Sequence, residues 1–361
     1  MAKEIGSKAS SLMERLLKNS TMKKTEPLLE SSLLNEQERV STTIPMINYA
    51  LGGTFDGGLG SGITTIAGPS RHFKTSFGLV MVAAYLKRYP DAVCYFYNNE
   101  FGAKKTYFEQ YGVDTNRVIH APFEDLEKLK FDITTQLEDL TEKDKVIFFI
   151  DSIGNAASVK EIDDALAGKS AADMTRAKQI KSILRIITPK LYIKNIPLIM
   201  IAHVYKTQEM FAKDVVSGGD AMIYNPDAVW IIGKNQLKEK DEITGSKFII
   251  RVNKSRYVKE RAQFPITVRW GEGIAKWSGF EEVAEQLNVI IPSKIGRSAA
   301  YTYNSIDGKD YQVLASDIDS DDDFWNRIIN ETDLTYRMES LYNIGAISKE
   351  KLSFTTEEEI D

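Results

Sequence analysis

The feature that most restricts the fold is a short apolar run that leads into a loop with one glycine and two cations, and then into a helix. Residues 63–67 are typical of a buried strand, the loop GPSRHFKT follows at 68–75, and residues 74–88 have helical periodicity. A loop in this context binds phosphate, because its backbone N–H groups and the start of the helix point at the anion. The candidate residues are consecutive: Gly68, Pro69, Ser70, Arg71, His72, Phe73, Lys74, Thr75 and Ser76.

Two side chains of this loop carry the chemistry, and a third departs from the usual pattern. Lys74 would neutralise charge on the β- and γ-phosphates, and the hydroxyl of Thr75 would ligate Mg²⁺. Phe73 occupies the position where the pattern has glycine. Phenylalanine adopts positive φ only at a cost, so the loop must either follow a different path or hold strain at Phe73.

Two further apolar runs end in carboxylates. Glu100 follows the run at 93–97, and Asp151 follows the run at 146–150. Each alone is also compatible with a core strand and a turn residue. Because the carboxyl ends of parallel strands meet at one sheet edge, Asp151 would hold Mg²⁺ through water, and Glu100 would accept a proton from the attacking water. The order of the three motifs predicts hydrolysis of a nucleoside triphosphate with Mg²⁺; the family resemblance given below implies that the nucleotide is ATP.

The rest of the chain alternates between apolar runs and amphipathic segments. Alternation of this kind is typical of right-handed βαβ units, so we expect an α/β fold with a mostly parallel sheet and helices on both faces. Two later runs suggest strands added at the sheet edge. The expected strands are 63–67, 93–97, 118–120, 146–150, 198–202, 228–232, 248–252 and 264–270, and the expected helices are 74–88, 124–140 and 172–188, the last stopping at Pro189.

The charge is distributed unevenly. Residues 301–361 hold 15 acidic and 5 basic side chains, whereas residues 1–300 hold 36 acidic and 41 basic ones. A tethered acidic segment either competes with a polyanion for basic groups or serves solubility. We expect a small arm at 1–35 with a helix near 10–18, a core at 36–280, and a small C-terminal region with an acidic tail at 281–361.

Composition excludes several classes of protein. No apolar run approaches the ~18 residues that cross a bilayer, and the amino terminus lacks a signal-peptide core. Cys94 is the only cysteine and the histidines number three, so neither an internal disulfide nor a zinc site of usual spacing is expected. These observations predict a soluble protein of a reducing cytoplasm, without membrane association.

The motifs together resemble those of the RecA-family recombinases over residues 35–280. The resemblance is strongest to the UvsX recombinases of tailed bacteriophages, because of Phe73 and because His203 ends the strand 198–202 where the bacterial family has glutamine. It rests on Thr43-Ile44-Pro45, Ala50-Leu51-Gly52-Gly53, the loop 68–75, Asn99-Glu100-Phe101-Gly102, Asp151-Ser152, Ser217-Gly218-Gly219 and Gly271-Glu272-Gly273-Ile274.

The resemblance implies roles at the nucleotide. Lys74 and Thr75 bind phosphate and Mg²⁺, Glu100 is the general base, and Asp151 is the outer carboxylate of the Mg²⁺ site. Tyr107 would stack on adenine, although a core-packing aromatic is the plain alternative. His203 would sense the γ-phosphate, although a histidine after an apolar strand is usually a satisfied core residue.

It also implies a pair of cations that act between subunits. In the family, two basic residues at the positions of Lys254 and Arg256 reach the γ-phosphate held by the neighbouring subunit. Period-2 alternation would place both side chains on one face of a strand end. The plain alternative is a solvated pair of cations.

Two segments that follow strands, 154–172 and 204–219, are longer than the loops usual in compact domains. Amines that meet phosphates, together with an apolar wedge between bases, can hold single-stranded DNA without reading its sequence. The segments are otherwise ordinary surface loops, but the resemblance makes them the DNA-binding loops. The candidate residues are Lys160, Lys169, Arg176, Lys206, Met210, Phe211, Lys213, Gly218 and Gly219.

The expected function is therefore ATP-dependent strand exchange in recombination, replication and repair. Subunits would polymerise with ATP on single-stranded DNA, and the filament would pair that strand with homologous double-stranded DNA. Expected partners include single-strand-binding and mediator proteins in a host-cell cytoplasm. Two alternatives remain: a structural, ATP-gated filament that coats DNA with little turnover, and a hexameric DNA helicase built on the same core.

Overall fold

A computed structural model describes residues 2–22, 24–31, 33, 38–169, 174–207, 214–239, 242–304 and 310–345 of the chain. It divides into two compact units, Met1–Glu38 and Arg39–Asp361. The first unit contains α1 (Ala2–Asn19) and the 3₁₀ turn η1 (Leu28–Glu30), and α1 is longer than the helix expected near 10–18. The side chains of Leu12, Met13 and Leu16 on α1 are exposed.

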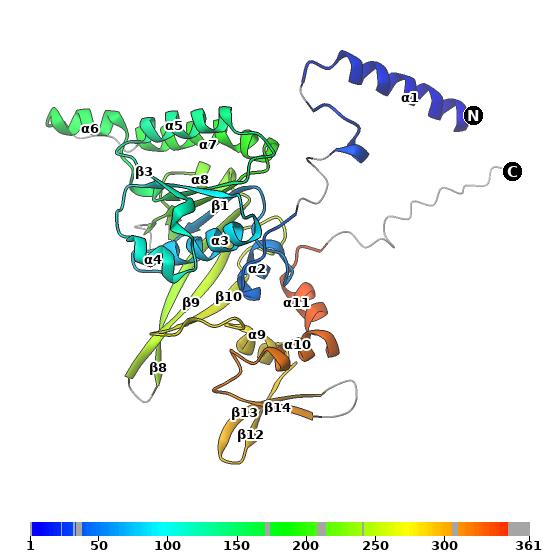
Figure 1. Ribbon diagram of the computed structural model, residues 1–361, viewed down its shortest axis with the longest axis vertical. Helices are drawn as coiled ribbons and strands as arrows, with labels where there is room; N and C mark the ends of the chain where they lie inside the picture. The colour runs from blue at the N-terminus through cyan, green and yellow to red at the C-terminus, as the bar shows by residue number, and fades with distance from the viewer. Residues whose placement is uncertain are drawn as a thin grey trace. The chain divides into compact units, whose positions relative to one another are not determined.

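The second unit is built on one large sheet (Figure 1). Its strand order is β11-β10-β9-β8-β1-β5-β4-β2-β3. The six strands from β8 to β3 are parallel, and β9, β10 and β11 are antiparallel additions, which confirms the predicted α/β fold. The strands are β1 (Gly62–Ala67), β2 (Val93–Asn98), β3 (Val118–Pro122), β4 (Val146–Asp151), β5 (Pro197–Ala202), β8 (Ala228–Glu239), β9 (Glu242–Lys254), β10 (Gln263–Arg269) and β11 (Gly273–Ile274).

Helices cover both faces of this sheet (Figure 1). One face packs against α2 (Pro45–Gly52), α3 (Lys74–Arg88) and α4 (Lys105–Gln110), which the 3₁₀ turn η2 (Thr115–Arg117) follows. The other face packs against α5 (Leu126–Asp139) and α7 (Met174–Ile193). Helix α5 forms here because its four buried apolar residues share one face and because the carboxylate of Asp125 caps its first turn.

Helix α7 does not stop at Pro189, as the sequence suggested, but continues to Ile193. Proline lacks the N–H that would bond to the preceding turn, which normally ends a helix. Leu191, two residues beyond, is fully buried in the same core as Ile187 and Leu184. Burial of the last turn therefore outweighs the lost hydrogen bond.

The two segments expected to be irregular contain regular structure. The first holds the 3₁₀ turn η3 (Ile153–Asn155) and helix α6 (Val159–Leu166), which Ser158 and Glu161 start with a capping box. The second holds the hairpin strands β6 (Val204–Lys206) and β7 (Asp214–Val216), and α8 (Ala221–Tyr224) follows it. Local capping and cross-strand pairing, which loop length alone does not reveal, explain the difference.

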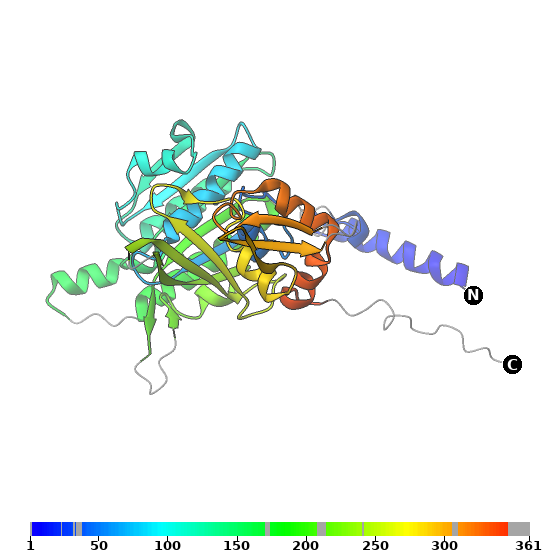
Figure 2. The ribbon, with the colours of Figure 1, turned by 90° about the horizontal axis from the view of Figure 1, so that it is seen from below.

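The C-terminal elements group together beside α9 in both views (Figure 1, Figure 2). Trp325 is fully buried there against Trp277 and Phe280, and Asp321 caps α10. Part of the acidic region is therefore folded structure and not a tail. The elements are α9 (Phe280–Gln286), β12 (Ile291–Ile295), β13 (Ser298–Asn304), β14 (Asp310–Leu314), α10 (Asp322–Glu331) and α11 (Leu334–Tyr342). Of the helices described, none is both long and apolar enough to cross a membrane.

Candidate functional site

The phosphate-binding loop lies between β1 and α3 and holds backbone strain. Phe73 has φ of 62° and ψ of 17°, the left-handed conformation in which a side chain is disfavoured. Its ring stacks on Phe248 of β9, with centroids 4.9 Å apart, and meets Phe77 and Tyr111 edge-on. Of the two possibilities that the sequence left for this position, the loop takes the strained one, and aromatic packing offsets the strain.

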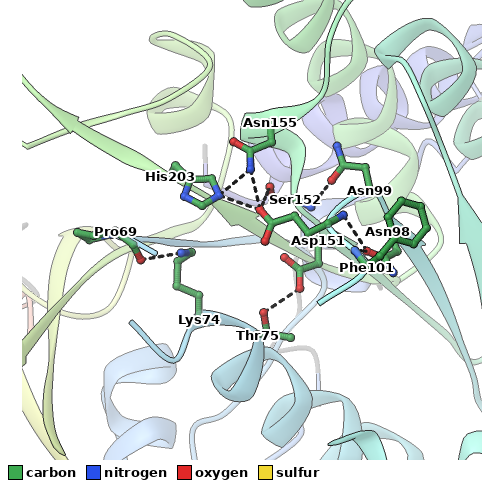
Figure 3. A network of polar contacts seen from close by, with 11 residues as sticks. Pro69, Lys74, Thr75, Asn98, Asn99, Phe101, Asp151, Ser152, Asn155 and His203 are labelled. Carbon is green, nitrogen blue, oxygen red and sulfur yellow. Dashed lines mark hydrogen bonds and ion pairs between the residues drawn. The ribbon is translucent and has the colours of Figure 1, made fainter. Parts of the chain in front are cut away.

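Lys74 lies under the loop, where its Nζ donates a hydrogen bond of 2.9 Å to the carbonyl oxygen of Pro69 (Figure 3). Burial lowers the pKa of Lys74, and the charges of Glu100 and Asp151 oppose that effect. A buried ammonium with one backbone partner is suited to receive an anion, because it has further N–H groups to donate.

Thr75 and Asp151 meet across the carboxyl edge of the sheet. Thr75 Oγ1 donates a hydrogen bond of 2.8 Å to Asp151 Oδ2 (Figure 3). Asp151 Oδ1 is buried and has no hydrogen-bond partner among the described residues. Burial raises the pKa of Asp151 to about 6. Mg²⁺ takes oxygen ligands and keeps several waters, so this hydroxyl and the free carboxylate oxygen fit a magnesium site.

Glu100 is the most heavily bonded carboxylate of the site. Its Oε1 accepts hydrogen bonds from Ser152 Oγ at 2.6 Å, from His203 Nε2 at 2.8 Å and from Asn155 Nδ2 at 3.0 Å. The hydrogen bond from His203, with that from Ser152 and the charge of Lys74, lowers the pKa of Glu100 to about 2 against an opposing effect of burial. The carboxylate is therefore ionised, and one oxygen carries the three donors.

Asparagine side chains fix the backbone around Glu100. Asn98 Oδ1 accepts from the N–H groups of Glu100 and Phe101, and Asn99 Oδ1 accepts from the N–H of Ser152 (Figure 3). These turns link the end of β2 to the end of β4. The strand ends thus bring Glu100 and Asp151 to one edge, as the sequence predicted.

A cavity of about 560 Å³ opens beside these groups. Arg71, Thr75, Glu100, Tyr107 and Asp151 are among the residues that line it. The hydroxyls of Tyr107 and Ser76 are hydrogen-bonded to each other. The cavity is large enough for a nucleotide and joins the end of the phosphate loop to an aromatic ring.

Lys254 and Arg256 lie away from this cavity. Lys254 Nζ donates to the carbonyl oxygen of Tyr224 at 2.6 Å, and Arg256 forms an ion pair of 2.8 Å with Asp227. Asp227 also accepts from the backbone N–H of Ile63, at the amino end of β1, whereas the phosphate loop follows the carboxyl end of that strand. The structure therefore brings the two cations together but not to the phosphate loop of their own subunit.

The candidate DNA-binding residues are distributed over four elements. Lys160 on α6 pairs with Asp164 at 2.7 Å, and Lys169 after α6 is exposed. Arg176 is half-buried on α7, and Lys206 is exposed on β6 opposite Asp214. Met210, Phe211 and Lys213 lie outside the described residues.

Gly218 and Gly219 follow β7 with φ of 105° and 84°. A Cβ on Gly218 would lie 2.9 Å from side-chain carbons of both Ile180 and Met222. The turn that closes the second segment therefore requires glycine at 218.

The sequence did not single out a role for Ser152, Asn155, Asn98 or Asp227. Asn98 ends β2 and Ser152 directly follows β4, and that position is the signal that could have found them, whereas Asn155 ends the 3₁₀ turn η3, four positions after Asp151. Asp227 precedes β8 and reaches residues far away in the chain, which no local pattern reveals.

A parallel sheet with a phosphate loop after one strand and carboxylates after two others defines a P-loop nucleoside triphosphatase. The family model of the RecA N-terminal domain matches residues 9–275. The chain is 42% identical to the "Recombination and repair protein" of Enterobacteria phage T4, over 98% of this chain and 90% of that protein. It is 27% identical to "Protein RecA" of Rhizobium rhizogenes over 75% of this chain and 72% of that one, and 28% identical to "Protein RecA" of Bartonella quintana over 75% of each.

The chain belongs to the RecA family. The resemblance to RecA-family recombinases, including those of tailed bacteriophages, is thereby confirmed.

Proposed function

We propose that this chain is an ATP-dependent DNA strand-exchange recombinase, and therefore a DNA-dependent ATPase. Membership of the RecA family supports this function. The observation that carries it in the structure is the convergence of Glu100 and the Thr75–Asp151 pair on one cavity at the start of α3, where Lys74 adjoins Thr75. Subunits bound to ATP polymerise on single-stranded DNA and pair it with homologous duplex, and hydrolysis releases the DNA.

Each side chain of the cavity has a task in hydrolysis. Residues 68–76 hold the phosphates, and Lys74 neutralises their charge. Thr75 and Asp151 would hold Mg²⁺, which supplies positive charge at the β- and γ-phosphate oxygens. Glu100 accepts the proton of the attacking water through Oε2, since Oε1 already carries three hydrogen bonds.

Tyr107 and His203 complete the nucleotide site. The hydrogen bond between Tyr107 and Ser76 orients the ring at the cavity wall, where it stacks on adenine. His203 lies between Glu100 and strand β6, so it is placed to report the γ-phosphate to the segment that follows.

Lys254 and Arg256 act on the neighbouring subunit. They lie at the opposite end of β1 from their own phosphate loop, so only an adjacent subunit can offer them a γ-phosphate. Positive charge supplied in trans is worth ~10³ to 10⁵ in rate for phosphoryl transfer. The unit Met1–Glu38, with its exposed leucines, serves as the polymerisation arm.

The segments around α6 and the β6–β7 hairpin form the DNA-binding surface. Lys169 and Lys206 are exposed and available to phosphates, whereas Lys160 must leave Asp164 to contribute. Further partners are single-strand-binding and mediator proteins, and the place of action is the cytoplasm of the host cell.

The deciding measurement is the rate of ATP hydrolysis with and without single-stranded DNA, with electron microscopy of the assemblies. Stimulation by DNA together with helical filaments supports the proposal. An unstimulated rate with DNA-coating filaments points to a structural protein, and closed rings point to a helicase; either result overturns it.

A further inference from the structure

Asn155 contacts Glu100 and His203, the two polar residues that govern hydrolysis in the proposed function. Asn155 itself has no catalytic role in that proposal. It is the last residue of η3, four positions after Asp151 at the end of β4. Its Nδ2 lies 3.0 Å from Glu100 Oε1 and 3.1 Å from His203 Nε2 (Figure 3). It is exposed, in contrast to the fully buried Ser152 that bonds to the same oxygen.

The ionised state of Glu100 determines where the protons shared with His203 and Asn155 lie. An ionised carboxylate only accepts hydrogen bonds, so the proton between Glu100 and His203 belongs to Nε2. Nε2 then has no lone pair to offer Asn155, and the amide N–H of Asn155 is directed at Glu100 Oε1. Three donors thus stabilise the negative charge of Glu100, and each makes the carboxylate a weaker proton acceptor.

We propose that Asn155 is a positioning residue that keeps Glu100 a weak proton acceptor in the DNA-free protein. DNA that contacts the segments 154–172 and 204–219 withdraws the amide of Asn155 from the Glu100 carboxylate. The inference rests on the proposed function, because it assumes that Glu100 is the base and that DNA binds to these segments. It adds a residue that connects the DNA-binding surface to the chemistry.

Asn155 lies next to elements that can shift, so its side-chain amide can move away from Glu100. Three residues separate it from α6, a helix none of whose side chains is buried and which therefore shifts at small cost. His203 immediately precedes β6. Two of the three donors on Glu100 therefore stand where a DNA-binding segment begins, and the third, Ser152, is held in the core. A pull on either segment removes a donor but leaves the carboxylate in place.

The test uses the full-length protein and two substitutions. Asn155→Ala removes the donor, and Asn155→Asp replaces it with a carboxylate of the same shape that repels Glu100 and accepts from His203. Asn330→Ala, at an exposed position of α10, is the matched control. The kcat and KM for ATP are measured without DNA and with saturating poly-dT, and binding of a fluorescent ATP analogue confirms that each variant is folded.

Loss of one net hydrogen bond, of the order of 1 kcal/mol, corresponds to about fivefold in rate. Asn155→Ala should therefore raise the DNA-free kcat about fivefold and Asn155→Asp at least as much, with KM and the DNA-saturated kcat within about twofold of the parent. Stimulation by DNA then falls by about the same factor, and Asn330→Ala leaves it unchanged.

A merely structural role predicts the opposite direction, because a misplaced base lowers both rates. Equal or lower DNA-free kcat in the two Asn155 variants overturns the inference. If Asn155→Ala does not bind the nucleotide analogue, the isosteric Asn155→Asp decides. Absence of DNA stimulation in the parent protein is a different result, since it removes the proposed function itself.

Discussion

The ring of Phe73 lies on the ring of Phe248, with their planes 21° apart, although 175 positions separate the two residues in the chain. The contact joins the phosphate loop to the β8–β9 hairpin, and Lys234 of β8 reinforces it by lying 5.7 Å from the centre of the Phe248 ring. The packing of the Phe73 side chain therefore offsets the conformational energy that its left-handed backbone costs.

Phe73→Gly and Phe73→Ala should differ in stability in a direction that isolates this strain. Both variants lose the ring, but only alanine keeps the cost of the left-handed conformation, which is about 1 kcal/mol. We expect the alanine variant to have the lower midpoint of urea unfolding, measured without nucleotide. Equal midpoints, or a more stable alanine variant, would mean that the position carries no strain.

Glu100→Gln should bind ATP and DNA normally but hydrolyse ATP at least ~10²-fold more slowly, because the amide cannot accept the proton. Its Oε1 can still accept from Ser152, so the fold is preserved. Filaments seen by electron microscopy should then persist in ATP. The matched comparison is Lys74→Ala, which should lose hydrolysis together with stable nucleotide binding. Loss of ATP binding in Glu100→Gln would assign the residue a structural role.

Asp151→Asn should change how stability depends on pH when magnesium is absent. Burial raises the pKa of Asp151 to about 6, above its usual 3.8. The stability that protonated Asp151 contributes to the folded protein is therefore fully present below about pH 4 and is lost as the pH rises through 6. This difference corresponds to roughly 3 kcal/mol, and asparagine stays neutral throughout.

In EDTA, the asparagine variant should therefore be the more stable protein at pH 7.5 and should match the parent near pH 4. Urea unfolding at both pH values provides the measurement. Asp91→Asn, in an exposed turn, is the control and should follow the parent. A constant difference between Asp151→Asn and the parent at both pH values would contradict the burial argument.

Gly218→Ala should destabilise the protein more than Gly168→Ala does, although both glycines have positive φ. Gly168 has open space around it, so alanine there costs only the conformational penalty of about 1 kcal/mol. At Gly218 the methyl group also meets Ile180 and Met222, and we expect a total of roughly 2 to 4 kcal/mol. The free energies of unfolding of the two variants give the comparison, and equal losses would remove the packing requirement at 218.

The double variant Lys254→Ala/Arg256→Ala should bind ATP as an isolated subunit but fail to hydrolyse it on DNA, since the missing charge is supplied to a neighbour. Mixing it with Lys74→Ala should restore part of the activity, because some interfaces then join an intact phosphate loop to an intact pair of cations. The measurement is DNA-stimulated ATP hydrolysis of each variant and of the mixture. Full activity of the double variant alone, or no rescue in mixtures that co-polymerise, would reject the action in trans.

Much of the fold follows from local pattern. The helix at 74–88 has the predicted bounds. The strands that lead to Glu100 and Asp151 were predictable, because buried parallel strands are short apolar runs and their carboxyl ends share an edge. The path of the loop at Phe73 was left open. Its outcome depends on Phe248, whose ring reaches it only after the sheet has closed.

Two other features could not be predicted from the local sequence, because they also depend on contacts between segments that are distant in the chain. The continuation of α7 past Pro189 depends on burial of Leu191, and the bond from Asn155 to Glu100 depends on the pairing of two strands. In each case an interaction between distant segments outweighs, or adds to, the preference of the local sequence.

The ion pair between Arg256 and Asp227 defines the state of this arginine in the isolated subunit, from which the free energy of assembly is counted. In the proposed action in trans, a γ-phosphate on the neighbour therefore competes for Arg256 with an aspartate that already pairs with it. Assembly is then an exchange of anions at Arg256, and its driving force is the difference between phosphate and carboxylate. On that proposal, Asp227 pairs with Arg256 again once hydrolysis removes the γ-phosphate. Disassembly would then leave no unpaired guanidinium in the separated subunit, which lowers its free-energy cost.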